Sequence, residues 1–426
     1  MIKILLEAPI LTRSGYGEHS RLVFRSLIKN DNVKVFIDPL AWGTTPWLAE
    51  FTDERKKIEE CISNQAVAIK LSQETNTNFA YDIQVRVGIP NEFEKRAPYS
   101  VCVTAGIETD RVSANWLMKT YQGIDKLIVP SNHSKSGFTS TSYQFLNQKT
   151  NEQGTISCNC PVEVVPYPVK NIDSTDLDFT LNTKFNFLSV SLVGQRKNME
   201  KMLKLFLDEF GENEEVGLVL KTAISSGSII DREKTKNHFS RIMNDDKYKD
   251  IKCKVYLLHG DLTDQEVHSL YVRDDIHAYV TTTHGEGYGL PIFEAAYSGM
   301  PIVATDWSAH LDFLSADYRE NGKVKNKKLF AKVDYELKPI NKEAVWKDIL
   351  EEGSQWAYPV GMSFRRQIRN VYKNFGMYQK WASVLKESLN NTHEEGKILQ
   401  QMHDAILERD VKKLNINTDS EEVLVL

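Results

Sequence analysis

The chain has 426 residues, of which 41% are hydrophobic and 26% are charged, so it is long enough for two globular domains. No stretch approaches the ~18 continuous apolar residues that a membrane-spanning helix requires, and the first residues predict a core strand rather than a signal peptide. The net charge of −5 argues against nucleic-acid binding that is driven by the overall charge.

Short apolar segments alternate with helical segments over residues 1–170. Several apolar segments are rich in valine and isoleucine, which is typical of parallel strands covered by helices on both faces. We expect strands at 2–6, 33–37, 83–87, 100–104, 126–129 and 162–165. Helices are expected at 18–28, at 114–121 and near Ser134. This alternation predicts a first Rossmann-like domain over 1–170.

The polar stretch 171–183 predicts a linker, after which the alternation resumes over 184–360. We expect strands at 185–191, 217–222, 255–258, 277–281 and 301–304, and helices at 199–210, 231–243 and 263–272. Two successive blocks of this kind indicate an α/β protein with two parallel-sheet domains. Ligands of open α/β sheets lie beyond the carboxyl ends of the strands, so we expect a substrate in a cleft between the domains.

The most informative segment runs from His284 to Thr305 and reads HGEGYGLPIFEAAYSGMPIVAT. It predicts a glycine loop and then a helix over about 291–297, because proline is favoured at the first helical position. Gly287 and Gly289 let backbone N–H groups approach a ligand, and a helix N-terminus favours negative charge. The segment is therefore suited to a phosphate or a diphosphate.

Two carboxylates, eight positions apart, frame this loop: Glu286 lies in it and Glu294 lies on the first turn of the expected helix. Both can flank the same bound molecule. The pattern resembles the signature of retaining GT-B glycosyltransferases and is closest to family 4, since it has both glutamates, both glycines, the Leu-Pro pair, the Ala-Ala pair and the Gly-x-Pro turn. The resemblance implies a GT-B fold, in which two Rossmann-like parallel-sheet domains face each other across a cleft.

A C-terminal segment also belongs to the fold that this resemblance implies. We expect the chain to be helical from Asn341 to about His393. Within 361–426, the segment 362–389 would be the helix that crosses back to the first domain, with a kink at Gly376. The end of the chain is expected to be frayed.

The resemblance further implies that the protein is a retaining glycosyltransferase, in which Glu294 binds the nucleotide ribose and Glu286 contacts the sugar at the reacting centre. Lys197 and backbone N–H groups would hold the diphosphate of a UDP- or GDP-linked sugar, since cations and a helix dipole can stabilise the leaving group. Glu286 and Lys197 are thus the expected catalytic residues, with no cofactor and no metal. The expected donor-binding residues are Glu294, Gly287, Tyr288, Gly289, Leu290, Arg196, Gly15 and Gly17.

Arg196 and the two glycines Gly15 and Gly17 match the family pattern less closely than the other residues of this set. Family 4 usually places an arginine and a lysine five apart, whereas here the earlier position is Leu192 and Arg196 directly precedes Lys197. Arg196 is therefore a candidate for the diphosphate by proximity to Lys197. Gly15 and Gly17 follow the first strand and open a helix, and they resemble a loop that approaches the donor phosphate or the acceptor.

The acceptor cannot be identified from these residues. Glu108 stands near a position where many relatives have a histidine, and it either contacts a substrate or has a structural role. The basic stretch of Lys323, Lys325, Lys327 and Lys328 leaves room for a glycosyltransferase that acts on a modified nucleic-acid base. A nucleotide-sugar-binding protein and a phosphorylase-like or epimerase-like GT-B protein would share the same cleft, and both functions also remain open.

The five cysteines are scattered and odd in number, which predicts a reduced, cytoplasmic protein. Cys158 and Cys160 are close in sequence, but no matching Cys or His pair is near them, so we expect no metal site there. The expected partners are a nucleotide-sugar donor and an acceptor of unknown class.

Overall fold

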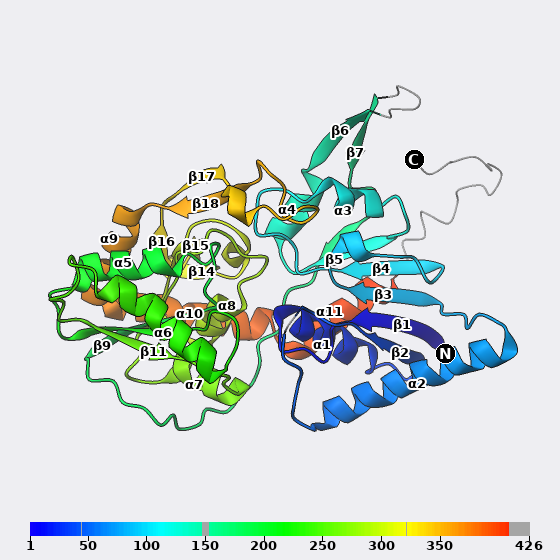
Figure 1. Ribbon diagram of the computed structural model, residues 1–426, viewed down its shortest axis with the longest axis horizontal. Helices are drawn as coiled ribbons and strands as arrows, with labels where there is room; N and C mark the ends of the chain where they lie inside the picture. The colour runs from blue at the N-terminus through cyan, green and yellow to red at the C-terminus, as the bar shows by residue number, and fades with distance from the viewer. Residues whose placement is uncertain (44, 147–152, 321, 409–426) are drawn as a thin grey trace.

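Two six-stranded parallel sheets form the framework of the computed structural model, which describes residues 1–43, 45–146, 153–320 and 322–408 (Figure 1). The strand order is β2-β1-β3-β4-β5-β8 in the first sheet and β11-β10-β9-β12-β13-β16 in the second. Every pairing within each sheet is parallel. In each sheet the strand that comes first in the chain, β1 or β9, lies inside the sheet, and later strands are added on both sides of it, as in doubly wound α/β folds. The predicted α/β class with two Rossmann-like domains is confirmed.

The first sheet is made by the N-terminal part of the chain. Its strands are β1 (Ile2–Ala8), β2 (Val33–Pro39), β3 (Ile83–Val87), β4 (Tyr99–Val103), β5 (Lys126–Val129) and β8 (Val162–Val164). The accompanying helices are α1 (Gly15–Leu27), α2 (Asp53–Thr75), α3 (Ala114–Lys119) and α4 (Asn132–Thr139). The central strands are almost completely buried, which explains their continuous apolar sequences.

The second sheet repeats this plan. Its strands are β9 (Phe185–Val190), β10 (Val216–Lys221), β11 (Lys254–Leu258), β12 (Ala278–Val280), β13 (Ile302–Thr305) and β16 (Ala331–Val333). The helices between them are α5 (Met199–Phe210), α6 (Ile229–Met243), α7 (Asp264–Val272) and α8 (Leu290–Ser298). In α5, the apolar residues Met199, Met202, Leu203, Phe206 and Phe210 recur at helical spacing and are buried in the core. The expected domain limits at 170 and 184 remain predictions.

Several elements have no counterpart in the sequence-based expectations. Among them are α2, β16 and the three hairpins β6 (Ser142–Leu146) with β7 (Gln153–Ser157), β14 (Ser315–Glu320) with β15 (Lys323–Lys328), and β17 (Tyr335–Pro339) with β18 (Gln355–Pro359). In α2 only Ile58, Gln65 and Ala68 are buried, so the helix lacks a regular apolar stripe. The β6–β7 hairpin projects from the first domain (Figure 1).

The basic stretch 323–328 is the exposed strand β15. Two of its lysines have carboxylate partners: Lys327 pairs with Glu320 at 3.4 Å, and Lys328 pairs with Asp306. The ammonium of Lys327 also lies 4.9 Å from the ring centre of Trp381. Half of the proposed polyanion-binding cluster is therefore already paired within the chain.

The prediction of continuous helix from Asn341 to His393 is wrong for its first part. Residues up to Pro359 form a 3₁₀ turn at Lys342–Ala344 and then β18, and the helical region begins at α9 (Gly361–Lys373). Gly353 has a φ of +80°, which ends any helix before the strand, and proline disfavours a helical residue before it.

The prediction of one crossing helix over 362–389 is also wrong, because the helix is interrupted at Asn374, between α9 and α10 (Phe375–Thr392). Gly376 lies within α10, two residues beyond the break. A third helix, α11 (Glu395–Leu407), follows. The tail expected to be frayed lies outside the described residues.

The last helix returns to the first domain, where it packs on α1 (Figure 1). Lys126 of β5 is almost fully buried, and its Nζ donates to the carbonyl oxygens of Ala405 and Glu408 at 2.9 Å each. The same ammonium pairs with Glu163 at 2.8 Å. A cation at a helix C-terminus satisfies the last carbonyls and complements the helix dipole, so it fastens α11 to the first domain. The C-terminal crossing is therefore confirmed. Among the described helices, none is long and apolar enough to cross a membrane.

Candidate functional site

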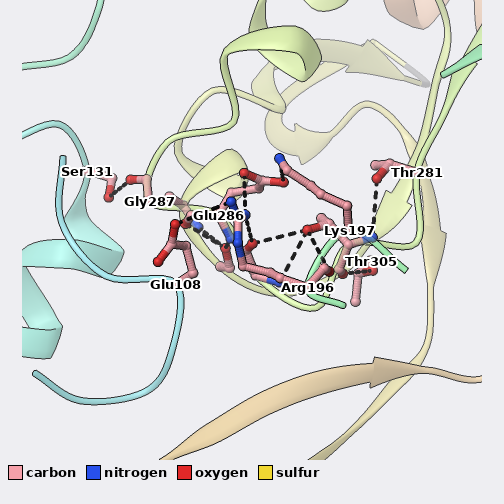
Figure 2. Close-up of polar contacts among 12 residues, drawn as sticks. Glu108, Ser131, Arg196, Lys197, Thr281, Glu286, Gly287 and Thr305 are labelled. Carbon is pink, nitrogen blue, oxygen red and sulfur yellow. Dashed lines mark hydrogen bonds and ion pairs between the residues drawn. The ribbon is translucent and has the colours of Figure 1, made fainter. Parts of the chain in front are cut away.

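The candidate site lies where the carboxyl ends of the two sheets meet. Ser131, after β5, donates from Oγ to the carbonyl of Gly287 in the loop between β12 and α8, at 2.9 Å (Figure 2). A Cβ on Gly287 would lie 2.4 Å from the carbonyl oxygen of Ala105, and one on Gly285 would lie 2.0 Å from that of Glu108. Both glycines are thus required for the two domains to touch. For Gly287 this is a steric reason that the sequence alone did not indicate.

The N-terminus of α8 faces this junction. The helix starts at Leu290 and its N-cap is Gly289, whose φ of +95° favours glycine. Pro291 occupies the first turn, where a missing N–H has no cost. No described side chain caps this helix end, so the N–H groups at its start have no side-chain acceptor and carry a partial positive charge.

Glu286 is the centre of a buried ion-pair cluster (Figure 2). Its carboxylate accepts from Lys197 Nζ at 2.6 Å and from Arg196 Nη1 at 2.9 Å, and the residue is only 6% exposed. Burial raises the pKa of a carboxyl group, but the ammonium and the guanidinium outweigh burial and lower the pKa of Glu286 to about 2. Glu286 is therefore an anion throughout the physiological pH range.

Arg196 connects this cluster to the first domain. Its guanidinium also donates to the carbonyl of Gly285 at 2.7 Å and pairs with Glu108, in the loop after β4, at 3.3 Å. The structure thus gives Glu108 a contact between the domains. Two cations face two carboxylates, so the cluster is neutral as a whole. A bound diphosphate would compete with the carboxylates for Arg196 and Lys197.

Ser308 fixes the backbone of Glu286. Its Oγ accepts from the N–H of Glu286 at 2.6 Å and lies 2.9 Å from the carbonyl of the same residue. Ser308 has a φ of +90°, which is unusual for a residue with a side chain. Ser308 therefore orients the loop that carries the carboxylate, and its Oγ also accepts from the N–H of Ala309 at the start of the following 3₁₀ turn.

Glu294 belongs to a second cluster, on α8. Its carboxylate accepts from the hydroxyl of Tyr271 at 3.1 Å. Nearby, Lys170 pairs with Glu18 of α1 at 3.0 Å and with Asp264 at 3.4 Å. Burial raises the pKa of Glu294 to about 7, although Lys170 and the Tyr271 hydroxyl act to lower it. Glu294 is thus poised between its neutral and charged forms near neutral pH.

Gly15 and Gly17 lie in the first turn of α1, whose N-cap Ser14 accepts from the N–H of Gly17 at 2.9 Å. A Cβ on Gly17 would lie 2.0 Å from the carbonyl oxygen of Thr12, so this glycine is required by packing. Gly15 has no described atom within 4 Å of its Cβ position. Packing therefore explains why position 17 is glycine but does not explain why position 15 is glycine.

The two residues beside Glu294 were missed by sequence reasoning. Tyr271 lies at the end of α7 and Lys170 lies just before the expected linker, and neither belongs to a motif with a fixed spacing. They reach Glu294 through the packing of separate elements. No local pattern could have identified them.

Comparison with known proteins identifies the architecture. No family model matches the chain, and no curated protein matches its sequence. Solved structures do match: sucrose-phosphate synthase from Thermosynechococcus elongatus has a TM-score of 0.60 and 12% identity over 94% of this chain and 97% of that one. Anabaena HepE in complex with UDP and glucose has a TM-score of 0.54 and 13% identity, over 95% and 99% of the two chains. The fold is GT-B.

Within this GT-B fold, the Glu286 cluster, the start of α8 and the start of α1 all lie at the junction of the two domains. The structure brings Glu286, Arg196 and Lys197 into direct contact, whereas Glu294 has different partners. Among the described residues, no group of His, Cys, Asp and Glu side chains is arranged to hold a metal ion.

We expect Glu294→Gln to stabilise the unliganded protein at pH 8 but not at pH 5. The pKa of Glu294 is about 7 in the folded protein, against a usual 4.5. Between pH 4.5 and pH 7 the native protein therefore keeps a proton on Glu294 that the unfolded chain has released. The carboxylate therefore costs stability that grows as the pH rises from about 4.5 to 7 and persists above it. The gain in the variant should be about 1–3 kcal/mol at pH 8.

Thermal or urea unfolding at the two pH values measures this effect. Glu387→Gln, on the exposed face of α10, is the matched control and should change stability at neither pH. An equal change for Glu294→Gln at both pH values would contradict the raised pKa.

Proposed function

We propose that the protein is a retaining glycosyltransferase that transfers a sugar from a UDP- or GDP-linked donor to an acceptor. The observation that carries this proposal is the buried cluster of Glu286, Arg196 and Lys197, which lies beside the uncapped start of α8 at the junction of two GT-B domains. The likeness to HepE, a protein whose structure holds UDP and glucose, supports the choice of donor.

The chemistry of a leaving nucleoside diphosphate fits this cluster. Negative charge develops on the diphosphate as the glycosidic bond breaks, and preorganised cations and N–H donors stabilise it. In this proposal Lys197 and Arg196 turn from Glu286 to the phosphates, together with the N–H groups of Tyr288 to Leu290. Glu286 then accepts hydrogen bonds from the hydroxyls of the transferred sugar. Glu294 accepts from the ribose.

Retention of the anomeric configuration follows in this scheme from attack on the same face from which the diphosphate leaves. The acceptor hydroxyl loses its proton to a phosphate oxygen of the leaving group, so no protein base is assigned. The expected cytoplasmic location remains a proposal that rests on the scattered, odd-numbered cysteines.

A panel of UDP- and GDP-sugars tests the function. We expect at least one to raise the unfolding temperature, since a ligand that binds only the native state stabilises it, and to be hydrolysed or transferred with release of the nucleoside diphosphate. Binding without any release would instead support a nucleotide-sugar-binding protein. Release of a sugar phosphate that depends on added inorganic phosphate would support a phosphorylase.

We also expect the activity to persist in excess chelator. The reason is that Lys197, Arg196 and the start of α8 supply the positive charge that a divalent ion would otherwise provide. Nucleoside diphosphate release should be measured in EDTA and again after Mg²⁺ or Mn²⁺ is added. Loss of turnover in EDTA that either ion restores would show that the cations do not suffice.

A further inference from the structure

A loop of the first domain lies over the carboxyl end of β1. Residues 40–52 connect β2 to α2, and backbone hydrogen bonds hold part of this loop against residues 8–13. Leu48 donates to the carbonyl of Leu11 at 2.8 Å, and Arg13 donates to that of Pro46 at 2.8 Å. Trp47 forms an antiparallel bridge with Thr12. The loop is therefore held in place beside the start of α1.

Aromatic side chains gather at this point. The ring centre of Trp42, from the loop, lies 4.2 Å from the ring centre of Tyr16, in the first turn of α1. The hydroxyl of Tyr16 pairs with Oγ1 of Thr104, just after β4, at 3.0 Å. Tyr16 thus reaches across the strand ends from β1 to β4, and Trp42 packs against it. We call Tyr16, Trp42 and Trp47 the aromatic shelf; Trp47 follows Trp42 in the same loop, is bridged to Thr12 and is 52% exposed.

The shelf is connected to the Glu286 cluster through a short run of contacts. Thr104, which holds Tyr16, is followed directly by Ala105, whose carbonyl lies against Gly287. Four residues after Thr104, Glu108 pairs with Arg196. Gly15, next to Tyr16, has open space beside it. The shelf therefore belongs to the first domain's side of the same junction.

We propose that the aromatic shelf binds a sugar ring of the acceptor, so that the acceptor is a carbohydrate. This inference rests on the proposed function. A pyranose ring has an apolar face of C–H groups and a polar edge of hydroxyls, and an aromatic ring with hydrogen-bonding neighbours matches both. Arg13 and Thr45 are polar residues on the two segments that form the shelf, close in sequence to its aromatic residues.

The composition of the shelf disfavours the other acceptor classes. The segments 9–14 and 40–52 contain a single basic residue, Arg13, and its guanidinium already donates to the carbonyl of Leu262 at 2.9 Å. A nucleic acid would require several cations for its phosphates. A lipid chain would require a continuous apolar groove, whereas two threonines and Glu50 interrupt the apolar residues of the loop here.

The test uses the whole chain, the donor identified by the nucleotide-sugar panel, and glucose, mannose, maltose, cellobiose and chitobiose as acceptor probes. We expect at least one saccharide to accelerate nucleoside diphosphate release above the rate in water. Trp47→Ala and Trp42→Leu should then raise the KM for that saccharide by about 10-fold or more, the size expected for one well-placed aromatic contact. Trp346→Ala is the matched control, because Trp346 is also exposed (62%) and lies outside the shelf.

The outcomes distinguish failure of the shelf assignment from failure of the proposed glycosyltransferase function. If the shelf variants leave the KM for the saccharide unchanged, the shelf does not bind the acceptor. The same conclusion follows from acceleration by a DNA oligonucleotide or by phospholipid vesicles when no saccharide accelerates release. In both cases the intact binding of the donor, measured by calorimetry, leaves the proposed function standing. If no nucleotide-sugar binds or turns over, the proposed function fails, and the shelf assignment fails with it.

Discussion

Glu286→Gln is expected to lower turnover at saturating donor by about 100-fold or more, while the protein still binds the nucleoside diphosphate. The substitution preserves the size of the side chain and removes its charge. In the proposed reaction this carboxylate contacts the sugar as positive charge develops on it, so its contribution is made mainly in the transition state. Loss of such an interaction lowers kcat more than it changes ground-state binding.

Affinity for the nucleoside diphosphate should be retained or become stronger in this variant. Lys197 and Arg196 are both held by Glu286 in the unliganded protein, and the substitution frees them for the phosphates. Because the pKa of Glu286 is about 2, its protonation does not limit activity between pH 5 and pH 8. Steady-state kinetics together with calorimetry measures both effects.

Glu209→Gln is the matched control for the loss of a buried, ion-paired glutamate. The side chain of Glu209 is 5% exposed and pairs with Arg365 and Arg369 on the second domain, outside the junction. Removing one partner of a buried ion pair destabilises a protein, by about 3–5 kcal/mol in strong cases. Both variants should therefore lose stability, but only Glu286→Gln should lose turnover. Similar turnover in the two variants would remove Glu286 from the reacting centre.

Lys197→Met is expected to weaken nucleoside diphosphate binding by about 1.5–3 kcal/mol, the range for a hydrogen bond to a charged group. This corresponds to an increase in Kd of roughly 10- to 100-fold. The ammonium lies at the carboxyl end of β9, 2.6 Å from Glu286, and a diphosphate that displaces this carboxylate gains a direct ionic contact. Methionine retains the buried stem of the side chain without its charge.

Lys201→Met provides the comparison for this variant. Lys201 is exposed on the first turn of α5, four residues after Lys197, and its removal changes the net charge equally. Calorimetry with UDP and GDP at two salt concentrations should show weaker binding and a smaller salt dependence for Lys197→Met alone. Equal affinities of the two variants would mean that Lys197 does not contact the phosphates.

The elements that could be predicted are those whose signal is local. The first strand, the strands β9 to β13 of the second sheet and the helix that begins near Pro291 have continuous apolar runs or a clear helical start, and these depend on neighbouring residues alone. Helix α2 has too few buried positions to produce a stripe, so no such signal exists. Helix is wrongly predicted before Pro359 because paired strands such as β17 and β18 depend on a distant partner.

The same division applies to the site. Local sequence is enough to place Glu286 in a glycine loop before a helix, Glu294 on that helix, and two cations after an earlier strand. The packing of distant segments is what pairs Glu286 with both cations and Glu294 with Tyr271. That packing also sets a carbonyl of the other domain against Gly287. Loop and helix starts follow from short-range backbone preferences, whereas ion pairs, pKa shifts and close contacts arise from residues that folding brings together from far apart in the chain.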